Sequence, residues 1–518
     1  AGQPCRVCPD PAMQSALVAA RDNEAQEAPL AQPPRTTCLD RQLLRELPGA
    51  WRRAYLFFAL SLAFVLGTAS MVNPPTISAF VDSVGIDTMP VAQAYQPLVL
   101  LPILFVYNFL CEALRSPQLL VCCVSLSYAA VYGLIAIRSL ASVHIEPWLA
   151  WVLFYTTNTK SVLFPVMLWS VMNDLSSTQY SKVAYPALVT AGQLGGLIGS
   201  LYATFVGKVG GTSGLLFVQA AALVAVAVLV WFACTSAAAA PAQEVDEGRV
   251  SLQPVHADGA NGDATVEVTG QARAAVRGRC GSALSVALHK LWGVVEGIPL
   301  ILSRPYVAGI FWIACAHLVP RTILDYQGTA LTNQRWPRKV DGHTVPGNKD
   351  RQTAFFAWCN VANAVGTGLM SVLGLRSLID RGGLLVTLLA LPIAMVASVL
   401  LVCFDHTFWT VQAVLVVVNV IQYALNGPSR EMLYVRTSKS IKYKAKSWSD
   451  MYGNFLQKTI GSLINLYVNR EQDSCAPHCF KPFFTGVYTA AWCAVWATIA
   501  GWLGLKHARL VRDGQMIS

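Results

Sequence analysis

Three positively charged side chains interrupt apolar segments of this sequence that are long enough to cross a membrane. They are Lys160 in YTTNTKSVLFPV, Arg321 in HLVPRTILDYQ and Lys458 in GNFLQKTIGSL. An ionisable side chain inside a bilayer is costly, and it usually faces a cavity or a charged partner. Lys and Arg are the usual protein partners of phosphate and carboxylate groups. A cavity lined by these three cations would therefore suit a small anionic substrate.

Each cation also has a structural interpretation, and the sequence leaves both interpretations open. Asp325 follows Arg321 at the spacing of one helical turn, so the two side chains share a helix face and can pair with each other. Lys458 can extend its ammonium group to the membrane surface. Lys160 can do so only if its apolar segment is shifted, because the segment otherwise centres on this residue.

No catalytic motif accompanies these charges. The sequence contains no Gly-rich phosphate loop followed by Lys-Ser or Lys-Thr, no paired-His metal motif on a helix and no Gly-x-Ser-x-Gly motif. We therefore expect no enzyme activity, no metal and no cofactor, and secondary transport rather than a nucleotide-driven pump. The polar pairs Cys5/Cys8 and Cys475/Cys479 are left without an assigned role.

The composition indicates what kind of protein carries these residues. Of the 518 residues, 54% are hydrophobic and only 13% are charged, and the mean hydropathy is +0.47. Soluble domains contain about a quarter charged residues, which disfavours a water-soluble enzyme, a nucleic-acid-binding protein and a disordered scaffold. We expect an integral membrane protein whose partners include the lipid bilayer and no nucleic acid.

The apolar runs predict an all-α membrane protein with twelve transmembrane helices in two six-helix halves. The spans lie near residues 54–73, 97–114, 118–137, 147–173, 183–206 and 213–234, then 305–325, 353–374, 383–403, 407–426, 448–467 and 482–505. The predicted domains are a polar N-terminal tail and surface helix (1–53), the first half (54–235), a hydrophilic linker and amphipathic helix (236–304), the second half (305–505) and a C-terminal tail (506–518). This is the organisation of a major-facilitator-like transporter, whose halves are related repeats.

Two local signals refine the spans. Asn73-Pro74-Pro75 is expected to end the first span, because proline removes a helical hydrogen bond. The fifth span reads AGQLGGLIGS, and its glycines at four-residue spacing, such as Gly195 and Gly199, favour close packing against a neighbouring helix.

The charge distribution predicts the orientation in the membrane. The net charge is +10, from 38 Lys and Arg against 28 Asp and Glu. The side that holds both termini carries most of the loop cations even without the central linker, and such cations mark the inner side. We expect both termini on the cytosolic, stromal or matrix side. An organelle inner membrane, of a plastid or a mitochondrion, is favoured, with the plasma membrane as the alternative.

A basic cluster precedes the eleventh span. Lys442, Lys444 and Lys446 lie in the sequence SKSIKYKAKSW. They can set topology and contact anionic lipids, or they can form a vestibule that concentrates polyanions at the mouth of a pore.

Two blocks of the sequence resemble the ATP/ADP translocase family, the nucleotide transporters of plastids and intracellular bacteria. In LWSVMNDLSSTQYSKVAYPALVTAGQLGGLIGS (168–200) the matching positions are Trp169, Asn173, Lys182, Tyr185, Pro186 and the glycines. In NGPSREMLYVRTSKSIKYKAKSWSDMYGNFLQKTIGSLI (426–464) they include Arg430, Glu431, Tyr434, Asp450, Asn454, Lys458 and Gly461. The resemblance implies the twelve-helix fold and adds Asn173 and Asn454 to the candidate substrate-binding residues Lys160, Arg321, Asp325 and Lys458.

The sequence also departs from this family. Family members that exchange ATP for ADP carry a Lys in the second span, where this chain has Phe109. They carry Glu residues in the fourth and seventh spans, at the positions of Thr157 and Pro320. Lys458 is kept.

We therefore expect a divergent secondary transporter of a nucleotide or another phosphorylated or organic anion, working by alternating access. Two alternatives stay open. A transport-inactive chain would be a structural subunit whose partners are other subunits of a membrane complex. An ion-coupled symporter of a small metabolite would use Asp325 or Asp174 as the ion site.

Overall fold

The computed structural model is built almost wholly from helices. It describes residues 49–114, 116–141, 145–175, 178–239, 297–337, 339–340, 343–345, 347–373, 375–434, 437, 441, 448–470 and 482–513. Within these ranges the only strands are β1 (Lys339–Val340) and β2 (His343–Thr344), which pair antiparallel. The predicted all-α fold class is confirmed for this part of the chain.

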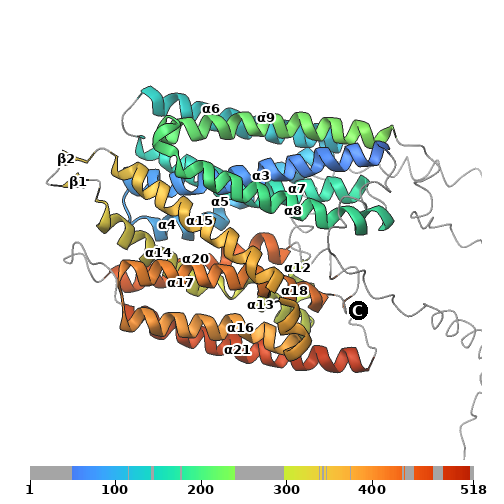
Figure 1. Ribbon diagram of the computed structural model, residues 1–518, viewed down its shortest axis with the longest axis vertical. Helices are drawn as coiled ribbons and strands as arrows, with labels where there is room; N and C mark the ends of the chain where they lie inside the picture. The colour runs from blue at the N-terminus through green and yellow to red at the C-terminus, as the bar shows by residue number, and fades with distance from the viewer. Residues whose placement is uncertain are drawn as a thin grey trace, which may run out of the picture. The chain divides into compact units, whose positions relative to one another are not determined.

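The helices form two groups along the chain (Figure 1). The N-terminal group comprises α3 (Gly49–Ser83), α4 (Met89–Ala94), α5 (Gln96–Ala113), α6 (Pro117–Ala141), α7 (Pro147–Leu175), α8 (Thr178–Thr204), η1 (Val206–Lys208) and α9 (Gly211–Ala238). The C-terminal group comprises α12 (Gly297–Leu302), α13 (Pro305–Cys315), α14 (Leu318–Arg335), α15 (Asn348–Leu373), α16 (Leu375–Phe404), α17 (Phe408–Ile421), η3 (Gln422–Asn426), α18 (Gly427–Tyr434), η5 (Ser449–Gly453), α20 (Asn454–Arg470) and α21 (Pro482–Arg512). Both η3 and η5 are π-helical.

Eight described segments are long and apolar enough to cross a membrane, as expected for a multi-pass integral membrane protein. They are Gly49–Ser83, Met89–Cys111, Pro117–Ala141, Gly211–Ala238, Pro305–Arg335, Gly382–Phe404, Phe408–Tyr434 and Phe483–Arg512. The other four predicted spans lie on α7, α8, α15 and the η5–α20 pair. Of these, α8, α15 and α20 pack against the opposite helix group. Helix faces that contact protein rather than lipid tolerate polar residues, which accounts for the weaker apolar signal. Twelve spans remain a prediction.

The first helix does not end where the prolines predict. α3 continues through Pro74 and Pro75 as far as Ser83, and both prolines are buried. Proline is tolerated inside membrane helices where neighbouring helices and polar side chains compensate for the lost backbone hydrogen bond. Next to the prolines, the Thr76 hydroxyl lies 3.1 Å from the Thr157 hydroxyl of α7. The prediction that Pro74-Pro75 terminates the span is therefore wrong.

Glycines bring α3 and α8 into close contact. A Cβ atom added at Gly67 would lie 2.7 Å from the carbonyl oxygen of Gly195, and one added at Gly199 would overlap the carbonyl of Gly67. No side chain larger than hydrogen fits between these two backbones. The prediction that the fifth-span glycines serve helix packing is confirmed.

This contact gives a stability prediction. Gly199→Ala is expected to lower the free energy of unfolding by about 1–3 kcal/mol, because the added methyl group forces the backbones of α3 and α8 apart. The matched change Gly133→Ala on α6, where the added atom meets nothing within 4 Å, is expected to be neutral or stabilising since alanine favours helix. Thermal melting of the two purified variants checks this. Equal melting temperatures would contradict it.

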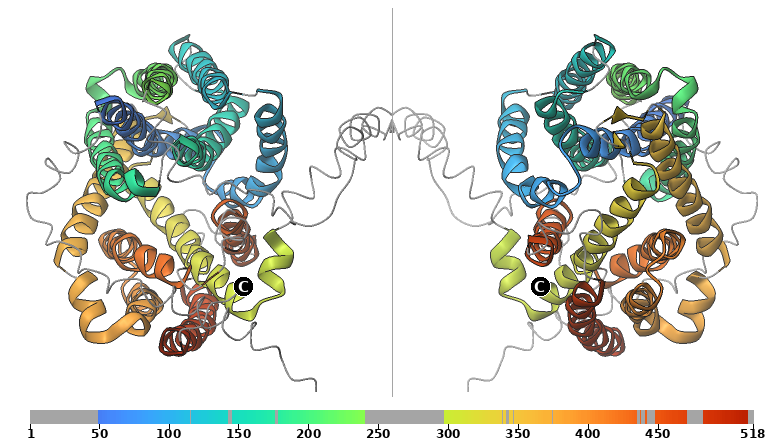
Figure 2. Two further views of the ribbon diagram at one scale, coloured as in Figure 1. Left: turned by 90° about the vertical axis from the view of Figure 1, so that its right-hand side faces the viewer. Right: turned by 90° about the vertical axis from the view of Figure 1, so that its left-hand side faces the viewer.

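The contacts within each group follow the same pattern. In the N-terminal group α3 packs on α8 and α6 packs on α9; in the C-terminal group α14 packs on α20 and α16 packs on α21. The two groups also meet reciprocally, through α8 against α15 and through α20 against α4 and α5 (Figure 2). Two related repeats would produce paired contacts of this kind.

Several sequence predictions lie outside the described residues. These are most of the N-terminal tail and surface helix (1–48), most of the linker (240–296), the basic residues Lys442, Lys444 and Lys446, and both polar cysteine pairs.

Candidate functional site

The seventh apolar segment is broken where its charged residues begin. α13 ends at Cys315 and α14 starts at Leu318, with Ala316 and His317 between them. Pro320 lies in the first turn of α14, where its missing N–H has no intrahelical partner to lose. The proline therefore explains the break. The new helix, α14, starts at Leu318, and Arg321 follows directly after its first turn.

Arg321 and Asp325 are partly exposed on a stretch of α14 that is otherwise buried. Between Leu318 and Thr329 every other residue is buried, whereas the side chains of Arg321 and Asp325 are 25% and 40% exposed. Arg321 Nε lies 3.4 Å from Asp325 Oδ2, so the ion pair predicted from their spacing is confirmed. Both side chains are therefore partly exposed on a stretch of helix whose other residues are buried.

Lys458 extends from α20 toward the same region. A Cβ atom added at Gly461 would lie 2.8 Å from the carbonyl oxygen of Val319, so α20 and α14 approach closely one turn after Lys458. The Lys458 ammonium lies 5.7 Å from the centre of the Phe455 ring and interacts electrostatically with Arg321 and Asp325. Two of the three predicted cations, Arg321 and Lys458, therefore interact with each other, and both interact with the carboxylate of Asp325.

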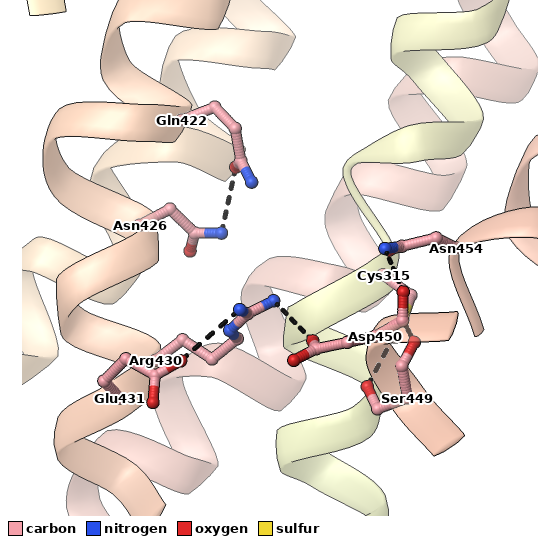
Figure 3. A network of polar contacts seen from close by, with 8 residues as sticks. All are labelled: Cys315, Gln422, Asn426, Arg430, Glu431, Ser449, Asp450 and Asn454. Carbon is pink, nitrogen blue, oxygen red and sulfur yellow. Dashed lines mark hydrogen bonds and ion pairs between the residues drawn. The ribbon is translucent and has the colours of Figure 1, made fainter. Parts of the chain in front are cut away.

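The α17–η3–α18 run supplies the facing polar residues. The hydroxyl of Tyr423 is a hydrogen-bond partner of the Arg321 guanidinium. Further along, Arg430 forms ion pairs with Asp450 of η5 at 3.3 Å and with its neighbour Glu431 at 3.4 Å (Figure 3). The Arg430–Asp450 pair joins α18 to the start of the η5–α20 pair.

The two candidate asparagines differ in what the structure shows. Asn454 donates from Nδ2 to the backbone carbonyl of Asp450 at 2.8 Å (Figure 3), one helical turn before Lys458. Asn173 lies on α7, and its side chain is outside the described part of the chain.

Lys160 lies on α7, inside the N-terminal group. Its side chain is fully buried. Its ammonium donates to Thr68 Oγ1 at 3.0 Å, to Gln219 Oε1 at 3.2 Å and to the Val65 carbonyl at 3.3 Å. These bonds use all three ammonium protons and tie α7 to α3 and α9. In this structure Lys160 faces neighbouring helices of its own group. A cavity lined by all three cations stays a prediction.

Thr157 also belongs to a buried network. Its hydroxyl lies 3.1 Å from that of Thr76 and receives a hydrogen bond from Tyr132 at 3.2 Å. Tyr128 donates to Thr159 at 3.0 Å in the next part of α7. Uncharged hydroxyl groups thus occupy this level of the helix, and no carboxylate is needed to satisfy them.

The sequence analysis did not single out four residues that the structure assigns to these clusters. Gln219 and Thr68 are isolated polar residues in apolar helices, so periodicity alone could have marked them only weakly. Arg430 and Asp450 lie in the block that resembles the translocase family, but on separate helices, so no signal in the sequence indicated that they pair.

No metal site is found among the described residues, where no three His, Cys, Asp or Glu side chains lie close enough to hold an ion. Among the described cysteines, Cys122 and Cys234 are free thiols.

Comparisons with known proteins address the fold. No protein-family model matches the sequence, and no curated protein is significantly similar to it. The structure of the POT family transporter PepTSo is similar, with a TM-score of 0.55 at 14% identity over 89% of this chain and 99% of that one. A peptide transporter POT in complex with sulfate has a TM-score of 0.53 at 11% identity over 91% and 99%. The nucleoside transporter NupG has a TM-score of 0.48 at 12% identity over 90% and 99%.

At these levels of sequence identity the comparisons give information about the fold alone. They add nothing to the resemblance to the ATP/ADP translocase family. The chain is similar in fold to these structures of POT family transporters.

Proposed function

We propose that the protein is a secondary transporter that moves a small organic or phosphorylated anion by alternating access between its two helix groups. The observation that carries this proposal is the set formed by Arg321, Asp325 and Lys458. It contains two cations and one carboxylate, and its ion pair is partly exposed on an otherwise buried helix. An excess positive charge among buried residues needs a negative partner, and a bound anion would supply it.

Each residue has a distinct role in the proposed site. Arg321 and Lys458 bind the anion, and Asp325 holds the guanidinium of Arg321 in place. Asn454 supports the turn of α20 that carries Lys458 through its bond to Asp450. Lys160 is outside the proposed site, because its donors are engaged by α3 and α9. Asn173 and the vestibule formed by Lys442, Lys444 and Lys446 stay predictions.

The resemblance to the ATP/ADP translocase family supports a nucleotide or another phosphorylated anion as the substrate. Phe109 replaces the second-span Lys of the exchangers, and a missing charge-assisted hydrogen bond costs about 1.5–3 kcal/mol. That cost corresponds to about ten- to a hundredfold in affinity. We therefore propose poor ATP/ADP exchange and better transport of another anion.

Substitution of Lys458 tests the proposal. In proteoliposomes that contain the purified protein, uptake of labelled organic phosphates and carboxylates is measured. Lys458→Gln is expected to raise the KM for the transported anion about ten- to a hundredfold, because one charge-assisted contact is lost. Lys208→Gln is the matched control: this exposed lysine stands 6.0 Å from the ring of Phe205, much as Lys458 stands near Phe455, and its substitution is expected to leave KM unchanged.

The outcomes separate the alternatives. Absence of uptake for every anion tested, together with co-purification in a large membrane complex, would favour a structural subunit. Uptake that requires a proton or sodium gradient and is lost in Asp325→Asn would favour ion-coupled symport. Fast ATP/ADP exchange would contradict the importance given to Phe109.

A further inference from the structure

The α17–η3–α18 run carries a stripe of polar residues along one face. Asn419, Gln422, Asn426 and Arg430 follow one another at intervals of three or four residues, and the hydrogen bond from Asn426 to Gln422 joins two of them across η3. This spacing places them on the same side of a helix. Polar residues in a membrane helix usually face the bundle interior or a water-filled space, so the stripe marks the inner face of this run.

Two contacts fix how this run lies against α14. Gln412 donates from Nε2 to the carbonyl of Gly328 at 2.8 Å. Further along the run, Tyr423 hydrogen-bonds with Arg321. Residue numbers therefore rise on the run as they fall on α14, and the two elements are antiparallel.

Asn426 is placed by the same register. Arg430 interacts electrostatically with His317, which continues the antiparallel order beyond the Tyr423–Arg321 contact. Asn426 lies between these two contacts, about 4–5 Å along the helix axis from Tyr423. Along the run, Asn426 therefore comes after the residue that contacts Arg321 of the proposed anion site, and before Arg430.

The amide of Asn426 is buried and half satisfied. The residue is 1% exposed. Its Nδ2 donates to Gln422 Oε1 at 2.9 Å, whereas its Oδ1 has no hydrogen-bond partner among the described residues. Arg430 has an unsatisfied donor instead. Its two terminal nitrogens form ion pairs with carboxylates, but its buried Nε has no hydrogen-bond partner among the described residues. Figure 3 shows both side chains on the same face of their run.

A buried acceptor and a buried donor without partners are costly to leave unfilled. A hydroxyl group satisfies both, because it donates one hydrogen bond and accepts others. A carbonyl could serve only Arg430, and an ammonium group only Asn426. The pair is therefore suited to an uncharged hydroxyl group.

We infer that Asn426 and Arg430 form a second subsite, which binds a hydroxyl group of the substrate next to its anionic group. The inference rests on the proposed anion site of Arg321 and Lys458 and narrows its substrate to hydroxylated anions. The short axial separation places the hydroxyl group a few bonds from the phosphate or carboxylate.

Binding to the purified protein tests the subsite without requiring transport. Ligand-induced thermal stabilisation gives apparent Kd values for two matched pairs, glycerol 3-phosphate with n-propyl phosphate and gluconate with hexanoate. The members of each pair share their charged group and differ in hydroxyl groups. At least one hydroxylated member is expected to bind about tenfold more tightly than its partner.

Variants assign this preference to Asn426. Asn426→Leu is expected to reduce the preference to about twofold or less while leaving the affinity of the unhydroxylated partner unchanged. Gln412→Leu removes another buried amide of the same run, one whose hydrogen bonds go to Gly328 and Thr332, and it is expected to keep the preference. This control separates loss of a ligand contact from loss of packing.

Three results would overturn the inference: equal binding within both pairs, no binding by any of the four compounds, or an unchanged preference in Asn426→Leu. The last result would mean that a structural water fills the space. A hydroxyl preference in binding without any uptake in proteoliposomes would support the subsite and contradict the proposed transport.

Discussion

Arg321→Gln is expected to reduce uptake of the substrate anion at least about a hundredfold. The substitution removes a cation from the proposed site and also leaves the Asp325 carboxylate, 3.4 Å away in the native protein, without its partner. The repulsion between this carboxylate and an anionic substrate adds to the lost contact, so the effect exceeds that of a single hydrogen bond to a charged group. Initial rates in proteoliposomes measure it.

The double variant Arg321→Gln/Asp325→Asn distinguishes substrate binding from simple ion pairing. Arg321→Gln alone is expected to lower the free energy of unfolding by about 1–3 kcal/mol, because an unpaired, partly buried carboxylate remains. The double variant is expected to recover this stability but not the uptake. If the double variant transported at the native rate, Arg321 would serve only to neutralise Asp325, and the anion site would lie elsewhere.

Much of the fold follows from apolar periodicity. Each predicted span lies on helical residues, because twenty apolar residues in a row can satisfy their backbone in a bilayer only as a helix. The close contact at Gly67 and Gly199 was also predictable from small-residue spacing. The continuation of α3 through Pro74 and Pro75 was not, because it depends on neighbouring helices that local sequence does not contain.

The site was only partly predictable for the same reason. The Arg321–Asp325 pair follows from helical spacing within one segment. The proposed grouping of Lys458 with that pair, and the proposed exclusion of Lys160 from it, depend on which face of each helix turns toward which neighbour. Composition identifies an intramembrane cation as costly, but it does not tell whether a substrate or a helix neighbour offsets the cost.

Substitutions around Lys160 test whether a buried cation is offset by a helix neighbour or by a substrate. Gln219→Leu is expected to lower the free energy of unfolding by about 2–3 kcal/mol, because the buried ammonium loses one of its three acceptors. Adding Lys160→Met is expected to restore most of the stability. Methionine has nearly the shape of the lysine stem, and replacing buried charge networks by apolar residues of similar volume is often neutral or stabilising. Thermal melting of both variants measures these changes.

Uptake by the double variant Lys160→Met/Gln219→Leu then assigns the role of Lys160. The two remaining acceptors keep contacts within α3: the Thr68 hydroxyl donates to the Phe64 carbonyl at 2.7 Å and lies 3.4 Å from the Val65 carbonyl. The double variant therefore leaves little unsatisfied. If Lys160 only joins α7 to α3 and α9, uptake should stay within about twofold of the native rate. A stable double variant that fails to transport would show that Lys160 reaches the substrate in another conformation of the transport cycle. The anion would then be handed between cations of both helix groups, and the site would not reside in the C-terminal group alone.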